Sequence, residues 1–167
     1  MKEGIGLKRL PALLFVLILM TTVGCSAKEP TAVAINRSFC CPAAVEQNGL
    51  RYEAGLTVAP EQCAAVFSWP EAISGMTMTC RGDSVSVRFG QSERETALPE
   101  PKQCFLYWLS RALAQPLTAV NRKENTLVFH GTIDGRAYLL TVDQDSLLPL
   151  YFEMASPDLT VRFKHSE

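Results

Sequence analysis

The sequence is poor in the residues and motifs on which catalysis depends. It has only two histidines, His130 and His165, each in or just after a segment with β-strand alternation. No G-x-S-x-G, H-E-x-x-H or phosphate-binding-loop motif occurs. Asp143 and Asp145 could form a metal pair, but Val-Asp-Gln-Asp-Ser between two strands is typical of a hairpin turn. The sequence therefore predicts a protein without catalytic activity, metal or cofactor.

An excess of charge of either sign is also absent. Lysine and arginine number 16, aspartate and glutamate 17, and the formal net charge is -1. Binding to nucleic acid needs a basic face, and attraction to anionic lipid headgroups needs a cluster of positive charge. After residue 24 no apolar run reaches the length of a membrane helix. Nucleic acid is therefore excluded as a partner, and no later segment is expected to anchor the chain.

The number of cysteines does not allow all of them to pair in disulfides once Cys25 is set apart. Five cysteines follow Cys25, and an odd set leaves at least one thiol free: Cys40, Cys41, Cys63, Cys80 and Cys104. No C-x-x-C occurs, and no histidine lies at metal-ligand spacing. Adjacent Cys40 and Cys41 would face opposite sides of a strand. We expect mostly buried thiols that act as small apolar residues, with one disulfide, for instance Cys41 to Cys63, as the alternative.

The N-terminal segment has the features of an export signal. Lys2, Lys8 and Arg9 give a basic start, and residues 10–20 form an unbroken apolar run. That run is short for a bilayer but suits the apolar region of a signal peptide. Small residues follow, and then Cys25.

Val23-Gly24-Cys25 resembles the lipobox of bacterial lipoproteins, in which the peptide is cut before the cysteine and the sulfur takes a diacylglycerol. This resemblance implies a signal peptide over 1–24, lipid attachment at Cys25, and a tether over 25–37 that includes a helical turn at 32–36. The protein would then lie on the extracytoplasmic face of the cell membrane, anchored by its lipid. The alternative is an ordinary secretory signal that is cut elsewhere, with Cys25 incidental.

Residues 38–167 have the length of one domain and mostly the period-two alternation of β-strands. Strands are expected at 39–45, 51–58, 63–67, 76–80, 85–89, 126–130, 136–142, 148–153 and 159–164. Asn48-Gly49 and Gly82-Asp83 supply hairpin turns. The one strong helix is predicted at 102–114, between Pro101 and Pro116, and it is apolar on nearly every side.

These elements predict an α+β fold, a curved antiparallel sheet of about 8–11 strands that forms an open half-barrel closed by one main helix and short helical segments. Such a sheet can enclose an apolar ligand cavity, or its side chains can fill the interior completely. The candidate cavity residues are large and apolar: Met78, Phe89, Phe105, Trp108, Leu109, Phe129 and Leu139.

The order of elements resembles the LolA/LolB-like lipoprotein-carrier superfamily, including lipoproteins of Gram-positive spore formers. The likeness rests on the strand end at residues 67–70, the hairpin over 76–89, the helix near 105–113, and the segments 138–150 and 159–163. It implies a half-barrel with helices as a lid. Carrier members hold acyl chains in the cavity, whereas some spore-former members are partner subunits of a peptidoglycan-processing enzyme.

Two functions are therefore predicted, both without catalysis. The first is binding of a lipid or acylated peptide in the cavity. The alternative is a structural adaptor for a cell-envelope enzyme, using exposed strand edges or the loop over residues 90–101.

Overall fold

The computed structural model describes residues 32–90 and 95–165. They belong to one compact unit that begins at Thr31. The predicted signal peptide and Cys25 lie outside the described residues. The hydrophobic core is a single cluster of buried side chains between Ile35 and Phe163. A chain that begins at Ser26 therefore keeps the whole core.

The described chain is mostly β-structure with one α-helix of ten residues, α2 (Phe105–Ala114). Two short 3₁₀ helices are present, η1 (Glu71–Ile73) and η2 (Pro101–Gln103). The strands are β1 (Ala32–Val33), β2 (Phe39–Gln47), β3 (Leu50–Ala59), β4 (Gln62–Trp69), β5 (Thr77–Arg81), β6 (Ser84–Arg88), β7 (Thr96–Ala97), β8 (Leu117–Lys123), β9 (Thr126–Ile133), β10 (Arg136–Asp143), β11 (Pro149–Met154) and β12 (Leu159–Phe163).

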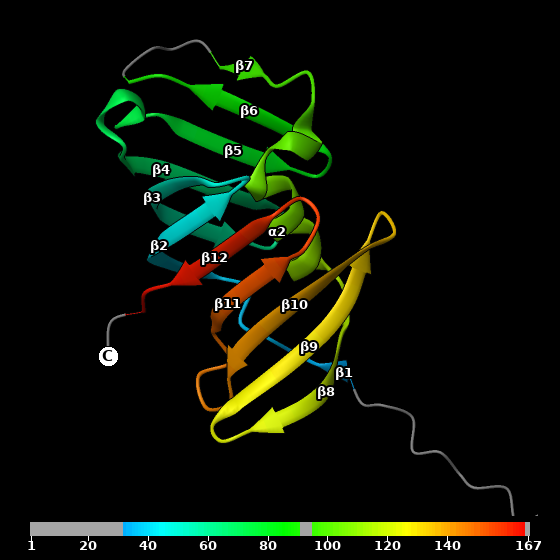
Figure 1. Cartoon of the computed structure of the whole chain (residues 1–167). Coiled ribbons are helices and arrows are strands. Elements are labelled where there is room, and N and C mark those ends of the chain that lie inside the picture. The colour runs from blue at the N-terminus through cyan, green and yellow to red at the C-terminus, as the bar shows by residue number, and fades with distance from the viewer. Residues whose placement is uncertain (1–31, 91–94, 166–167) are drawn as a thin grey trace, which may run out of the picture. The chain divides into compact units, whose positions relative to one another are not determined.

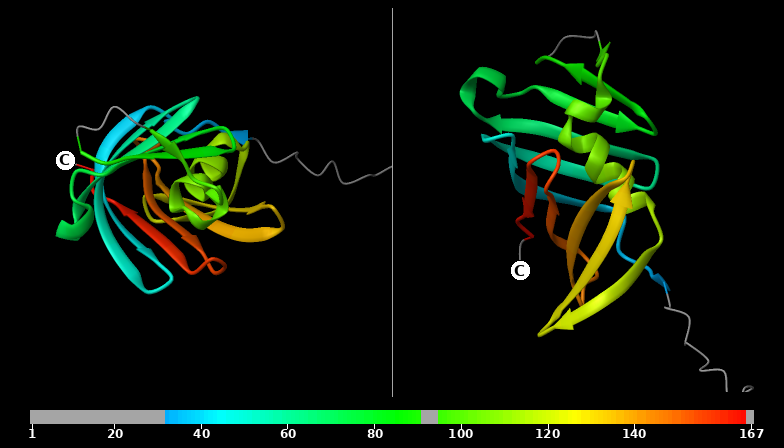
Figure 2. Two further views of the ribbon diagram at one scale, coloured as in Figure 1. Left: turned by 90° about the horizontal axis from the view of Figure 1, so that it is seen from above. Right: turned by 45° about the vertical axis from the view of Figure 1, so that its right-hand side comes forward.

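All strands belong to one antiparallel sheet in the order β1-β8-β9-β10-β11-β12-β2-β3-β4-β5-β6-β7. The sheet is open, with β1 and β7 at its two edges. Figure 1 shows the strands fanning out along the sheet, and the view from above shows the sheet curling around α2 (Figure 2, left). The predicted fold class, an open antiparallel half-barrel with one main helix, is confirmed.

Alternation decides which side of the sheet each residue occupies. On β10, for example, Tyr138, Leu140 and Val142 are buried, whereas the residues between them are partly exposed. The same period on the other long strands covers the concave face with apolar side chains. At the β2–β3 turn, Asn48 and Gly49 both have positive φ, as an Asn-Gly hairpin turn requires.

Three strands of the structure, β1, β7 and β8, were not predicted from the sequence. β1 and β7 have two residues each, too few to show a period. β8 ends in Asn121, Arg122 and Lys123, which read as a charged turn but pair with β9. Charged side chains are tolerated there because β8 lies next to the sheet edge, and β1 covers only its first two residues.

The tether was expected to extend to residue 37, but the part of it that the structure describes belongs to the domain. Residues 32–33 form β1 rather than a helical turn, and Ile35 is buried in the core. The backbone N–H of Asn36 donates to the carbonyl of Leu147 at 3.0 Å. Residues 33–37 therefore lie on the domain. Within 32–90 and 95–165, no helix is both long and apolar enough to cross a membrane.

Candidate ligand-binding site

Helix α2 lies in the concavity of the sheet and contacts β4, β5 and β6 on one side and β9 on the other. Seven of its ten residues are buried: Phe105, Leu106, Tyr107, Trp108, Leu109, Ala112 and Leu113. The sheet thus covers two sides of the helix, and η2, the segment that leads into the helix, contacts it as well. A helix that is apolar nearly all round is stable only in such a place.

The interior beneath the helix is filled. Trp108, Leu109 and Phe129 have no exposed surface. The indole N–H of Trp108 donates to the carbonyl of Lys102 at 2.8 Å, which ties α2 to η2. Among the described residues, these side chains occupy the space between α2 and the sheet. Of the two possibilities for the interior, a filled core is the one that the structure shows here.

A pocket of about 530 Å³ remains at the end of the half-barrel where α2 begins. We call it the end pocket. Its apolar lining consists of Tyr52, Phe67, Ile73, Met76, Met78, Leu98, Pro99, Cys104 and Phe105. Its polar lining includes Gln47, whose side-chain amide donates to the carbonyl of Gln103 at 2.9 Å. An apolar concavity with a few polar groups is the usual form of a small-molecule site.

The structure brings only two of the seven candidate residues, Met78 and Phe105, to the end pocket. Trp108, Leu109 and Phe129 belong to the filled core instead.

The other two candidates lie elsewhere. Phe89 follows the last residue of β6 and is 62% exposed, because the strand ends before its alternation can bury it. Leu139 stands between the buried residues Tyr138 and Leu140, so it faces the outer side of the sheet.

Sequence reasoning missed several residues of the end pocket. Tyr52 and Phe67 fall on the apolar side of their strands, so alternation could have identified them. Ile73 and Leu98 lie in connecting segments without a period. Only the fold shows that both connections pass the start of α2.

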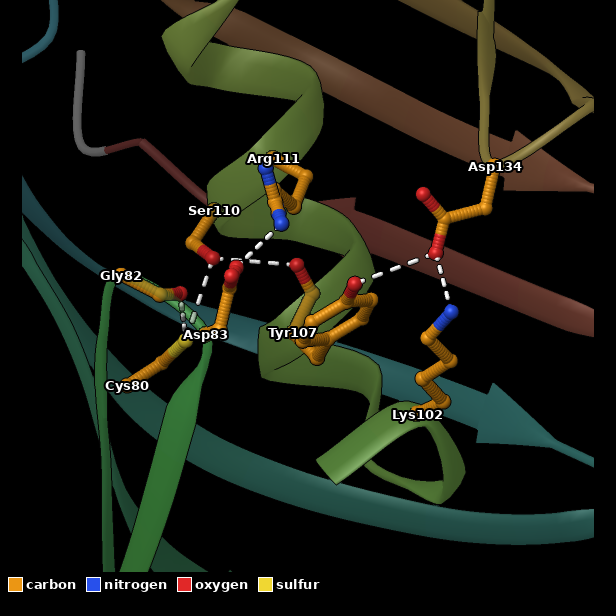
Figure 3. A network of polar contacts seen from close by, with 8 residues as sticks. All are labelled: Cys80, Gly82, Asp83, Lys102, Tyr107, Ser110, Arg111 and Asp134. Atoms are coloured by element: carbon orange, nitrogen blue, oxygen red, sulfur yellow. Dashed lines mark hydrogen bonds and ion pairs between the residues drawn. The ribbon is translucent and has the colours of Figure 1, made fainter. Parts of the chain in front are cut away.

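Two turns of the sheet hold α2 in place through polar contacts (Figure 3). On one side the Arg111 guanidinium pairs with Asp83 of the β5–β6 turn. On the other, Asp134 of the β9–β10 turn accepts a hydrogen bond from the Tyr107 hydroxyl at 3.1 Å and pairs with Lys102 at 2.6 Å. The hydrogen bond from Lys102 lowers the pKa of Asp134, and the same contact raises the pKa of Lys102.

A smaller pocket of about 350 Å³ lies near the end of α2 and is bordered by Cys63, Cys80 and Ser110. The Cys80 thiol and the Ser110 hydroxyl are hydrogen-bonded at 3.1 Å. Burial raises the pKa of the Cys63 and Cys80 thiols, so both stay protonated and unreactive near neutral pH.

The five cysteines that the structure describes are free thiols, and all except Cys40 are buried. Cys40 and Cys41 face opposite sides of β2, as expected. The alternative disulfide between Cys41 and Cys63 is wrong, because β3 lies between their strands. Two strand spacings amount to about 9–10 Å, whereas the Cα atoms of a disulfide lie within about 7 Å.

The polar residues considered for catalysis are dispersed. His130 is exposed on β9, and Nε2 of His165 lies 2.6 Å from the carbonyl oxygen of Pro149. Asp143 Oδ1 accepts hydrogen bonds from the backbone N–H groups of Asp145 and Ser146, the arrangement expected for a hairpin turn. In 32–90 and 95–165 no group of three or more potential ligands could hold a metal ion.

No model of a known protein family matches this chain, and no curated protein matches it either. Several solved structures are similar to it.

An uncharacterized conserved protein from Thermus thermophilus has 14% identity and a TM-score of 0.45, over 78% of this chain and 80% of that one. A chain in the structure of the CwlD amidase from Clostridioides difficile in complex with the GerS lipoprotein has 16% identity and a TM-score of 0.44, over 100% and 99%. A LolA superfamily protein from Nitrosomonas europaea has 15% identity and a TM-score of 0.40, over 78% and 71%. The structures similar to this chain thus include a LolA superfamily protein, the superfamily that its order of elements resembles.

Proposed function

We propose that this protein is a non-catalytic binding protein of the cell envelope that takes up the apolar chain of a lipid or acylated peptide. The observation that carries this proposal is the end pocket, whose volume of about 530 Å³ lies in the range of small-molecule sites. Because the interior beneath α2 is filled, we place the ligand in this larger pocket, at the end of the half-barrel where α2 begins. A chain inserted there would contact Phe105 and Phe67, two buried aromatic residues of the lining.

The lining of the end pocket suits a flexible apolar chain. Met76 and Met78 have unbranched side chains that adapt to different shapes. Phe67 and Phe105 stand edge to face at 6.2 Å and form a firm wall. Each methylene removed from water contributes about 0.8 kcal/mol, so even a partly inserted chain gains useful binding free energy.

A neutral apolar probe tests the proposal without involving charge. N-phenyl-1-naphthylamine should gain fluorescence and saturate when it is added to a chain that begins at Ser26. Replacing Ile73 with tryptophan should fill part of the end pocket and weaken binding about tenfold, the effect of roughly 1.4 kcal/mol.

Val66→Trp is the matched control, because Val66 is 50% exposed on the outer side of β4. The proposal fails if the probe does not saturate, or if the two tryptophan variants bind it equally well.

The membrane anchor is part of the proposal and is supported by the export signal and by Val23-Gly24-Cys25. Two acyl chains attached at Cys25 would hold the protein on the extracytoplasmic face. In cells of a lipoprotein-producing bacterium, the full chain should partition into the detergent phase of a Triton X-114 extract, and Cys25→Ala should move it to the aqueous phase. Unchanged partitioning of that variant would exclude a lipid at Cys25.

A protein partner is the second candidate function, and a groove on the outer face favours it. Trp69 is 51% exposed at the end of β4 and borders a groove of about 540 Å³ together with Arg51 and Arg162. Tryptophan and arginine are enriched among the residues that contribute most to protein interfaces. In the solved complex the GerS lipoprotein accompanies the CwlD amidase. For this chain, a partner enzyme is a proposal that rests on its own surface.

The test compares the parent chain with Trp69→Ala as bait in envelope extracts. An envelope enzyme that binds through this groove should be lost with Trp69→Ala and kept with Phe89→Ala, which removes an exposed aromatic side chain outside the groove. Recovery of the same proteins by all three baits would count against the groove.

A further inference from the structure

A polar depression adjoins the end pocket. It has a volume of about 380 Å³ and shares Gln47, Tyr52 and Gln103 with the end pocket. Lys102 from η2 and Arg136 from β10 also line it. We call this depression the cationic mouth. The apolar pocket therefore lies next to a region with two positively charged side chains, with Gln47, Tyr52 and Gln103 bordering both.

The two cations differ in how their charge is already compensated. Lys102 pairs with Asp134 at 2.6 Å, which occupies one of the three donors of its ammonium group. Arg136 takes part in none of the ion pairs among the residues that the structure describes. Its guanidinium lies 5.0 Å from the centre of the Trp108 ring, and this cation–π contact holds the group in place.

Two opposing charges lie nearby: Asp134, which is already paired with Lys102, and Glu100, which lines the end pocket but not the cationic mouth. Its carboxylate accepts a hydrogen bond from the side-chain amide of Gln103. Cations thus outnumber anions along the combined lining, and the unpaired cation is Arg136. A guanidinium is weakly hydrated and offers a planar fork of donors that matches a carboxylate or phosphate.

We propose that the ligand is an amphiphile with an anionic head, whose apolar chain fills the end pocket and whose oxyanion binds Arg136 and Lys102 in the cationic mouth. This inference rests on the proposed function, because it assigns a head to the chain proposed there. The oxyanion can be the carboxylate of a fatty acid or the phosphate of a phospholipid. Both have the charge and the acceptor geometry that the guanidinium requires.

Three amphiphiles with the same chain and different heads test the proposal: dodecanoate, dodecyl phosphate and dodecyltrimethylammonium. Each is titrated below its micelle concentration into the chain that begins at Ser26, and heat release is measured. The anionic compounds should bind at least about tenfold more tightly than the cationic one, as expected for one charge-assisted hydrogen bond. The tighter of the two anions identifies the carboxylate or the phosphate as the natural head.

Arg136→Gln should remove most of this preference, and Lys102→Gln should remove part of it. Arg122→Gln changes the net charge equally but lies exposed on β8 outside the cationic mouth, so it should leave the preference intact. Equal binding of all three amphiphiles would overturn the anionic head and leave the proposed function standing. Failure of all three, together with failure of the neutral probe, would overturn the proposed function itself.

Discussion

The clearest stability prediction concerns Gly131, which faces Tyr138 directly across β9 and β10. The ring of Tyr138 is buried and occupies the place where a side chain on residue 131 would begin. A Cβ added at Gly131 would lie 2.4 Å from Cζ of that ring. Carbon atoms that are not bonded to each other pack at about 3.5–4.0 Å, so the ring has to move. Tyr138 also packs against Phe152, with ring centroids 5.8 Å apart, which limits its escape.

Gly131→Ala should therefore destabilise the fold by about 1–3 kcal/mol, the usual cost of forcing extra volume into a packed core. For a domain of this length, that loss corresponds to a decrease in Tm of roughly 3–10 °C. Thermal unfolding followed by circular dichroism measures it.

The control is Gly55→Ala, since Gly55 is exposed on β3 and a Cβ there meets nothing within 4 Å. That change should be neutral or stabilising by about 0.5–1 kcal/mol, because alanine is less costly than glycine in a strand.

A double-mutant cycle isolates the clash. In a Tyr138→Ala background the ring is gone, and Gly131→Ala should then cost nothing. If Gly131→Ala lowers Tm equally in both backgrounds, the explanation by the Tyr138 ring is wrong. A Gly131→Ala variant as stable as the parent would refute the packing described here.

Three further predictions concern other parts of the fold. In the chain that begins at Ser26, iodoacetamide at pH 8 should modify Cys40 alone. Burial raises the pKa of Cys41 and Cys104 to about 11, and Cys63 and Cys80 are buried as well. Mass spectrometry showing several modified cysteines in folded protein would contradict this. Trp108→Phe should cost about 1–3 kcal/mol in urea unfolding, since it leaves the Lys102 carbonyl without its donor and a gap in the core, and an unchanged midpoint would disprove the link between α2 and η2. Gly49→Ala should cost about 1 kcal/mol, because φ is +76° there; a gain in stability would rule out the positive φ of this turn.

Much of the fold could be predicted because alternation is strong on the long strands. The sheet buries one face, so residues such as Val85 and Val87 or Val161 and Phe163 must face inward, and this fixes the strands and their register. The helix was also predicted, because prolines bound an apolar run, but its start was placed at residue 102, whereas α2 begins at Phe105 after the 3₁₀ helix η2. The short strands β1 and β7 had no such signal, since pairing partners rather than their own residues define them.

The candidate site was predictable only in part. Large apolar residues indicate what is buried, but they do not show which of them border empty space. Trp108 and Phe129 were equally plausible as cavity walls or as core, and only the packing of α2 against the sheet assigns them to the core. Arg136 attracted no attention in the sequence, because its place beside Lys102 depends on where β10 passes the start of α2.

The pairing of β12 with β2 has a consequence for how this protein is made. The strands β2 to β7 form one continuous block of sheet and β8 to β12 another, and among the described residues the two blocks pair through β12 and β2 alone. Lys164 and Glu53, 111 positions apart in the chain, form an ion pair across this region. Closing so long a loop is entropically costly and slows folding. Until β12 leaves the ribosome, β2 presents an unpaired edge that can recruit other chains. Folding of the sheet therefore cannot be complete before β12 has been synthesised, and the export that we propose, if it precedes folding, would keep that edge out of the crowded cytoplasm.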